Sequence, residues 1–97
     1  METKFTPGPW SICYDGQLDG ADGTRVLFLP FDSYKEFNDL PPTFKANIRL
    51  IAAAPELLAA LIEARAQVAD ICLSYRIPFP EASMVRYDDA IDKATGA

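Results

Sequence analysis

Eight prolines spread along this 97-residue sequence limit its fold more than any other feature. Proline fixes the φ angle of its own residue, has no backbone N–H to donate and biases the preceding residue toward extended geometry. Pro7 and Pro9 therefore exclude a helix at the start. Pro30 ends the strand before it or places that strand at a sheet edge. The prolines at positions 41, 42, 55, 78 and 80 interrupt helical segments. The chain is predicted to consist of short elements between these breaks.

The first predicted element is a strand that begins at Trp10. Ile12 and Tyr14 share one face with Trp10 at the two-residue period of a strand. The pair Asp15-Gly16 that follows is typical of a turn, so the strand is expected to end there.

A second strand is predicted over residues 25–31. The run at residues 26–29 is uninterrupted and apolar, which predicts burial on both faces of that strand. Residues 17–24 hold glycines and turn-favouring dipeptides, so a loop or an irregular hairpin connection is expected between the two strands.

The helical period begins at residue 43. Phe44, Ile48 and Ile51 recur at i, i+4 and i+7, which predicts a helix over residues 43–53 with one buried face. Residues 32–42 before it are predicted to form a loop, in which residues 33–37 can form a short helical turn.

Two more helices are predicted after residue 54. Pro55 suits the first turn of a helix, and Glu56 follows where a negative charge is favourable against the helix dipole. An apolar stripe then continues for about five turns to Tyr75. After a break at residues 76–80, a last stripe over residues 84–94 is closed by Gly96 as the C-terminal cap.

These elements predict an α+β fold in a single domain of residues 1–97. A small antiparallel β-sheet or hairpin over about residues 10–31 precedes a helical hairpin and a C-terminal helix over about residues 43–95. A chain of this length has room for one core, and its 49% apolar and 24% charged residues are typical of a folded protein.

The residue types of common catalytic and metal sites are missing or wrongly spaced. The sequence has no histidine, the usual general base near neutral pH and the commonest metal ligand. Cys13 and Cys72 lack the spacing of a zinc or iron–sulfur site, so we interpret both as small core residues. No glycine motif for phosphate binding leads into a helix. We therefore expect no enzymatic activity, no metal and no cofactor.

The charge balance favours some partners over others. Fourteen acidic and nine basic side chains give a net charge of -5, which repels nucleic-acid backbones and favours a basic protein partner. The longest weakly charged stretch, residues 50–62, is interrupted by Pro55 and Glu56 and is too short to cross a bilayer. The first fifteen residues have no unbroken apolar run either. We expect a cytoplasmic protein that binds neither nucleic-acid backbones nor membranes.

Five residues are candidates for binding a ligand or partner: Trp10, Lys45, Asn47, Arg49 and Arg65. Lys45 and Arg49 are four residues apart, a spacing at which two cations destabilise an isolated helix, so an anionic group is expected beside them. Ordinary pairing with the chain's own acidic residues explains the same pattern. Trp10 follows a rigid Pro-Gly-Pro segment, either as a stacking surface for a ligand or as a core anchor.

Self-association through helices is a further expectation. The side chains at positions 57, 64 and 71, and those at 61, 68 and 75, are spaced by seven residues, as in helices that pack side by side. Packing within one chain accounts for the same spacing. Because a chain this short has little core, we expect a homo-oligomer.

Three segments resemble a known group of proteins: TPGPW at residues 6–10, ANIRLIAAAPELL at residues 46–58 and KATG at residues 93–96. They are similar to segments of small proteins encoded by bacteriophages and prophages. The resemblance implies a phage accessory protein in the cytoplasm of an infected bacterium, and it carries over no catalytic residue. Residues 17–44 match no such pattern, which makes them the expected location of partner specificity.

The function expected from this resemblance is the binding of a host factor, such as a component of an antiphage defence system, which the protein blocks or sequesters. One alternative is an oligomeric sponge that captures an anionic nucleotide signal between protomers, with Lys45, Arg49 or Arg65 and an aromatic side chain. A structural or regulatory role in the phage is the other alternative.

Overall fold

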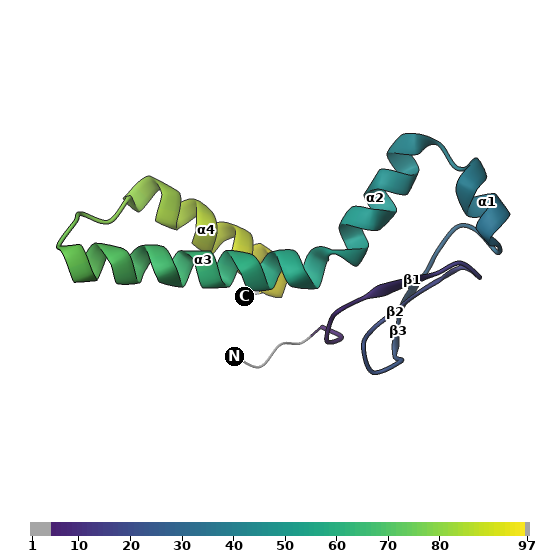
Figure 1. The fold of residues 1–97 in the computed structure, drawn as a ribbon, viewed down its shortest axis with the longest axis horizontal. Helices are drawn as coiled ribbons and strands as arrows, with labels where there is room; N and C mark the ends of the chain where they lie inside the picture. Colours follow the sequence, from purple (N-terminus) through teal and green to yellow (C-terminus); the bar gives the residue numbers. More distant parts are fainter. Residues whose placement is uncertain (1–4, 97) are drawn as a thin grey trace. The chain divides into compact units, whose positions relative to one another are not determined.

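The computed structural model describes residues 5–96, so residues 1–4 and 97 of the predicted domain lie outside the described part. The elements are, in order, β1 (Ser11–Cys13), β2 (Gln17–Asp19), β3 (Arg25–Phe28), α1 (Tyr34–Asp39), α2 (Pro42–Ala52), α3 (Ala54–Tyr75) and α4 (Glu81–Thr95). A small antiparallel sheet followed by helices confirms the predicted α+β class (Figure 1).

Residue contacts divide the chain into two compact units. The N-terminal unit is Met1–Glu56 and the C-terminal unit is Leu57–Ala97, so α3 begins in the first unit and continues into the second. The expectation of a single domain stays a prediction.

The sheet of the N-terminal unit has three antiparallel strands in the order β1-β2-β3. Leu18 of the central strand pairs with Ile12 of β1 and Leu27 of β3, and its side chain is completely buried. Gly16 lies in the turn between β1 and β2 with a φ of 106°, a conformation that favours glycine. The turn predicted at Asp15-Gly16 is therefore confirmed.

Two sequence predictions for this sheet differ from the structure. β2 lies within residues 17–24, where the sequence predicts a loop or an irregular hairpin connection, because pairing with a neighbour on both sides stabilises a strand too short to show alternation. Phe28 of β3 is 75% exposed and not buried on both faces. β3 is an edge strand, and the Phe28 ring instead lies 4.8 Å from the guanidinium carbon of Arg25.

Two helices complete the core of the N-terminal unit, and Figure 1 shows α1 and α2 on the same side of the strands. Phe31, Phe37 of α1 and Ile48 of α2 are buried together. Within the predicted loop of residues 32–42, the optional helical turn forms as α1 and continues to Asp39. The Ser33 hydroxyl caps it by accepting a hydrogen bond from the backbone N–H of Glu36 at 3.2 Å.

The predicted buried face of α2 is narrower than expected. Ile48 is buried, but Phe44 and Ile51 are 43% and 41% exposed, so the prediction that all three are buried is wrong. The strands are three or four residues long, and a sheet this small covers only part of an eleven-residue helix.

The C-terminal unit is an antiparallel hairpin of α3 and α4 (Figure 1), so the C-terminal helix is itself one arm of the hairpin. An ion pair between Arg65 of α3 and Asp88 of α4 links the two arms. Within the described part of this unit, the buried apolar residues are Cys72 and Ile91. Gly96 caps the C-terminus of α4 with a φ of 75°, as the sequence predicts. Among the helices of residues 5–96, none has the length and apolar character that a membrane span requires.

Candidate functional site

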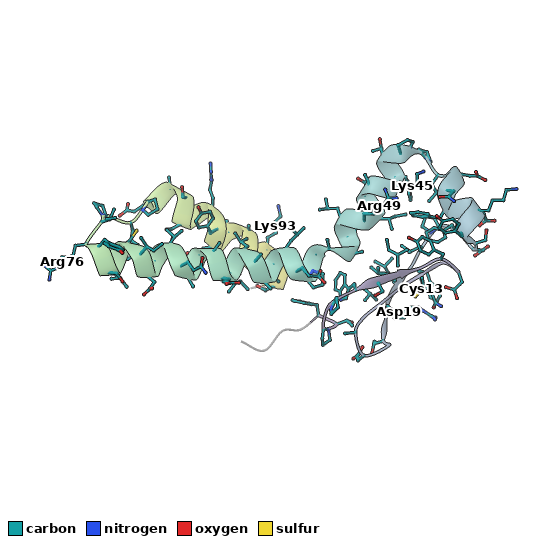
Figure 2. All side chains as sticks on the ribbon, viewed as in Figure 1. Cys13, Asp19, Lys45, Arg49, Arg76 and Lys93 are labelled. Carbon is teal, nitrogen blue, oxygen red and sulfur yellow. The ribbon has the colours of Figure 1, made fainter. Side chains whose placement is uncertain are left out.

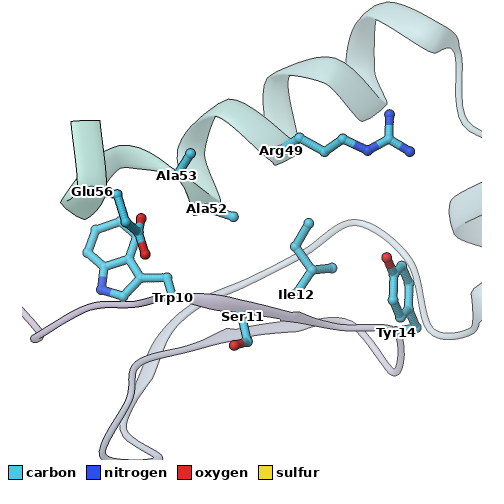
Figure 3. Close-up of a pocket in the computed structure, with 8 residues that line it drawn as sticks. All are labelled: Trp10, Ser11, Ile12, Tyr14, Arg49, Ala52, Ala53 and Glu56. Atoms are coloured by element: carbon cyan, nitrogen blue, oxygen red, sulfur yellow. The ribbon is translucent and has the colours of Figure 1, made fainter. Parts of the chain in front are cut away.

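An open hollow with a volume of about 520 Å³ lies between β1 and α2 in the N-terminal unit (Figure 3). We call it the β1–α2 hollow. Its lining residues come from the first strand, from α2 and from the start of α3: Trp10, Ser11, Ile12, Tyr14, Arg49, Ala52, Ala53 and Glu56. The hollow therefore brings together Trp10 and Arg49, two of the five binding residues predicted from the sequence.

The strand side of the hollow is built by alternation along β1. Trp10, Ile12 and Tyr14 point toward α2, whereas Ser11 points away from it (Figure 3). Successive side chains of a strand point to opposite faces, so every second residue reaches the hollow. The predicted shared face of these three side chains is confirmed.

Trp10 is held in place by the segment that precedes it. Its indole Nε1 donates a hydrogen bond to the Thr6 carbonyl oxygen at 2.9 Å, and the ring of Phe5 meets the indole edge-on with centroids 6.3 Å apart. Gly8 lies against Pro55 so closely that a Cβ atom added to Gly8 would be 2.5 Å from the Cβ of Pro55. The TPGPW segment therefore packs on the junction between α2 and α3, within the N-terminal unit.

The helix side of the hollow has an uncharged middle and a charge at each end. Ala52 and Ala53 provide small side chains in the middle, which leaves space above β1 (Figure 3). Arg49 lies toward the Tyr14 end, and Glu56 lies toward the Trp10 end, in the first turn of α3. The surface is thus positive at one end and negative at the other.

Arg49 is held by an aromatic ring and not by an acid. Its guanidinium carbon lies 5.7 Å from the centroid of the Phe37 ring, a cation–π contact. Within residues 5–96, no carboxylate forms an ion pair with Arg49. Its charge is therefore available to a bound group.

Lys45 and Asn47 do not line the hollow. Figure 2 shows Lys45 on the same helix as Arg49, but its Nζ donates a hydrogen bond to the Asn38 carbonyl oxygen at 3.2 Å. Asn47 is exposed on α2. The sequence spacing of Lys45 and Arg49 therefore does not bring both cations to one binding surface.

Arg65 lies in the C-terminal unit and is paired with an acid of its own chain. Its guanidinium donates two hydrogen bonds to the carboxylate of Asp88, one of them from Nη2 to Oδ2 at 3.3 Å. These bonds raise the pKa of Arg65 and lower the pKa of Asp88. Arg65 also borders a second hollow, of about 480 Å³, together with Asp88 and Glu81. Arg65 therefore fits the second interpretation of the sequence, in which a cation pairs with an acidic residue of its own chain.

Cys13 lies on β1 next to Asp19 of β2 (Figure 2). Its Sγ donates a hydrogen bond to the Asp19 carboxylate at 3.4 Å, and burial together with this bond raises the pKa of the thiol. A thiol with a raised pKa is a poor nucleophile near neutral pH. Cys72 is buried, as the sequence predicts, and no group of three metal-ligating side chains occurs in the part of the chain that is described.

Six lining residues were not among the sequence candidates: Ser11, Ile12, Tyr14, Ala52, Ala53 and Glu56. For the two alanines a signal exists in the alanine run before Pro55, because small side chains at the end of a helix allow another group to approach closely. A single sequence does not show which group approaches, and here it is the segment around Trp10.

Comparison with known proteins places the chain in a phage setting. A family model described as Salmonella phage P22 protein Y8K6 matches residues 1–97. No match was found among curated proteins or solved structures. Because the family match extends over the whole chain, this chain belongs to the family of Salmonella phage P22 protein Y8K6.

Proposed function

We propose that this protein is a noncatalytic phage accessory protein that binds a host protein and blocks or sequesters it, with the β1–α2 hollow as its contact surface. One observation carries the proposal. Residues 6–10 and 46–58, the two longer segments that resemble other phage proteins, both contribute lining residues to this hollow, and they pack together through Gly8 and Pro55. Residues 6–10 and 46–58 thus contribute to the surface of the β1–α2 hollow as well as to packing inside the unit.

The chemistry of the hollow suits a protein segment. Trp10 and Tyr14 are of the residue types that most often anchor protein interfaces, and arginine is the third such type. The uncharged middle accepts an apolar side chain, while Arg49 and Glu56 at the two ends pair with an acidic and a basic group. A short stretch of partner chain with an apolar residue between opposite charges fulfils all these contacts.

The partner we propose is a basic host protein in the bacterial cytoplasm, such as a component of an antiphage defence system. The net charge of -5 attracts a positively charged surface and speeds encounter with it. The same charge disfavours nucleic-acid backbones as the direct ligand.

The second candidate function is a sponge for an anionic nucleotide, and the convergence of Trp10, Tyr14 and Arg49 in one hollow favours it. An aromatic ring stacks on a base, and a guanidinium pairs with phosphate. Glu56 in the same lining disfavours a ligand with several phosphates. Arg65 cannot assist, since it lies in the C-terminal unit and is paired with Asp88.

The test compares three tagged forms of the full chain in lysate from infected bacteria. Arg49→Glu reverses the charge at one end of the hollow, whereas Lys35→Glu makes the same charge change at an exposed residue of α1 outside it. Retained proteins and retained small molecules are both identified by mass spectrometry, and each retained species is then titrated against the purified forms.

We expect a host protein that binds the wild type and Lys35→Glu with similar dissociation constants and binds Arg49→Glu at least about tenfold more weakly, since a charge reversal at a contact commonly costs a factor of this size. If a nucleotide shows that pattern and no protein does, the sponge is correct. Equal retention by all three forms would overturn the role of the hollow.

A further inference from the structure

The apolar surface of α3 is wider than α4 covers. Leu58, Ile62, Arg65, Ala69 and Cys72 are buried or half-buried along one line of the helix, the line that includes the Arg65 contact to α4. Beside this line, Leu57 is 53% exposed, Ile71 is 51% exposed and Tyr75 is 73% exposed. A large part of the apolar stripe therefore faces away from the hairpin.

The part of the stripe beside the α4 contact has the period of a coiled coil. Its members are separated alternately by four and three residues, and we call them the α3 seam: Leu57, Leu61, Ala64, Val68, Ile71 and Tyr75. A mean spacing of 3.5 residues keeps such a line facing a second helix that packs alongside. Because the seam runs from Leu57 to Tyr75, it is about 28 Å long.

α4 extends the same face of the hairpin. Ser83, Tyr87, Ala90 and Ala94 form an uncharged line on this helix, which we call the α4 strip. With about 100° of rotation per residue in each helix, and α4 antiparallel to α3, the α4 strip falls on the side of the hairpin where the α3 seam lies. The serine and the two alanines are small enough to allow a neighbouring helix to approach closely.

The residues that flank the seam fit an identical partner. On the side away from α4, the seam is bordered by Ala60, Gln67 and Ser74, which carry no charge. The acidic residues of α3 lie one step further round the helix, and the Gln67 amide donates a hydrogen bond to one of them, Glu63, at 3.3 Å. Two copies of the seam can therefore meet without bringing like charges together. A positively charged partner would instead bind near the acidic residues of α3, which lie beside the seam and not on it.

We infer that the face formed by the α3 seam and the α4 strip is the interface of a homodimer, in which two hairpins form a four-helix bundle. The seam and the strip are about 28 Å and 18 Å long, and with a contact width of about 10 Å they offer about 460 Å² per chain or about 920 Å² in total. This area is at the low end for a specific interface, as expected for a dimer that dissociates on dilution. It also supplies the core that the hairpin lacks, because Cys72 and Ile91 are its only buried apolar residues in the described range.

The test is the molar mass of the full chain in solution, measured by light scattering after gel filtration and by sedimentation equilibrium. We expect the wild type to have twice the chain mass of 10.7 kDa. Ile71→Glu places a charge on the seam and is expected to raise the dissociation constant of the dimer at least about tenfold. Leu73→Glu is the matched control, since Leu73 is 68% exposed and lies off the seam, and its dimer is expected to match that of the wild type.

A second variant distinguishes weaker dimerisation from unfolding of the chain. Gln67→Glu removes no apolar contact but brings like charges together across the dimer, so its dimer is expected to weaken at low salt and to recover at high salt. Helical circular dichroism is expected to be the same as in the wild type. A monomeric wild type at tens of micromolar, or equal masses for Ile71→Glu and Leu73→Glu, would overturn the inference.

Discussion

Leu18 contributes most directly to the stability of the N-terminal unit. Its side chain is completely buried between Ile12 and Leu27 of the neighbouring strands. Truncating such a residue loses its transfer free energy and leaves a cavity. We expect Leu18→Ala to lower the free energy of unfolding by about 2 to 5 kcal/mol, as measured by urea denaturation followed through the fluorescence of the single tryptophan.

Leu50→Ala is the control for that measurement. Leu50 is 61% exposed on α2, so the same truncation there is expected to change the free energy of unfolding by about 0.5 kcal/mol or less. Equal losses for the two variants would mean that Leu18 is not the centre of the sheet's core.

The pair between Arg65 and Asp88 makes part of the stability depend on pH. The hydrogen bonds from Arg65 hold the pKa of Asp88 below its ordinary value of 3.8. The folded pKa is therefore lower than the unfolded one, and protons bind more strongly to the unfolded chain. The stabilisation is complete above pH 3.8 and is lost as the pH falls through the lower folded pKa. Both side chains are more than a third exposed, so the effect is small.

Thermal unfolding of the wild type and of Asp88→Asn measures this contribution. We expect the wild type to have the higher Tm at neutral pH. The difference is expected to shrink as the pH falls below 3.8 and to vanish below the lower folded pKa, where Asp88 of the folded chain gains a proton. A difference in Tm that stays constant down to the acid limit would show that the substituted amide disturbs packing and that the ion pair contributes nothing.

At the scale of elements, the prolines made the helices predictable. Pro42 begins α2, Pro55 is the second residue of α3, and the break at residues 76–80 separates α3 from α4. These boundaries depend on local chemistry, because proline has no backbone N–H and fits the first turn of a helix but not its interior. The α+β class follows from the same signals.

The strands were less predictable, because pairing across the sheet decides them. β2 has three residues and no alternation of its own, so nothing within Gln17–Asp19 marks it as a strand. The apolar run at residues 26–29 predicts burial on both faces, although Pro30 also allows a sheet edge. In the structure the sheet ends at β3 and Phe28 is exposed. Both errors concern contacts between distant residues, which local periodicity does not report.

Packing at the junction of α2 and α3 depends on the absence of a side chain at Gly8. A methyl group there would lie 2.5 Å from the Cβ of Pro55, too close for either backbone to remain in place. We expect Gly8→Ala to destabilise the protein by about 1 to 3 kcal/mol and to change the near-ultraviolet circular dichroism of Trp10. Gly23→Ala is the comparison, because a Cβ at Gly23 meets no atom within 4 Å, although its φ of 84° still costs some strain.

The outcome of that comparison also bears on the hollow. If Gly8→Ala alters the tryptophan signal and Gly23→Ala does not, the TPGPW segment positions Trp10 by docking on α3. If neither variant alters the tryptophan signal, the hydrogen bond from Trp10 to Thr6 is sufficient to hold the indole.

At the scale of the whole molecule, the candidate site was predictable only in part. The absence of histidine excludes chemistry that depends on this residue, and Trp10 and Arg49 do line one surface. The binding role stays a prediction. The sequence could not show that Arg65 belongs to a different unit, or that Asp88 neutralises it from 23 residues away. Pairings at that separation depend on how the chain turns between helices, and a single sequence does not encode them in any short motif.

Charge and exposed apolar surface together control how the whole molecule behaves as pH changes. The net charge of -5 comes from carboxylates, and the isoelectric point is about 4.5. Several large apolar side chains, among them Phe28 and Leu73, are more than half exposed. We expect electrostatic repulsion between the negatively charged copies to oppose non-specific association through these side chains. We expect solubility to be lowest near pH 4.5, measured by turbidity across an acid-to-neutral series at fixed concentration and low salt.

Lys35→Glu makes the net charge more negative and is expected to move this minimum to lower pH. A minimum that does not move with charge would mean that exposed apolar surface, and not charge, sets the solubility of the chain.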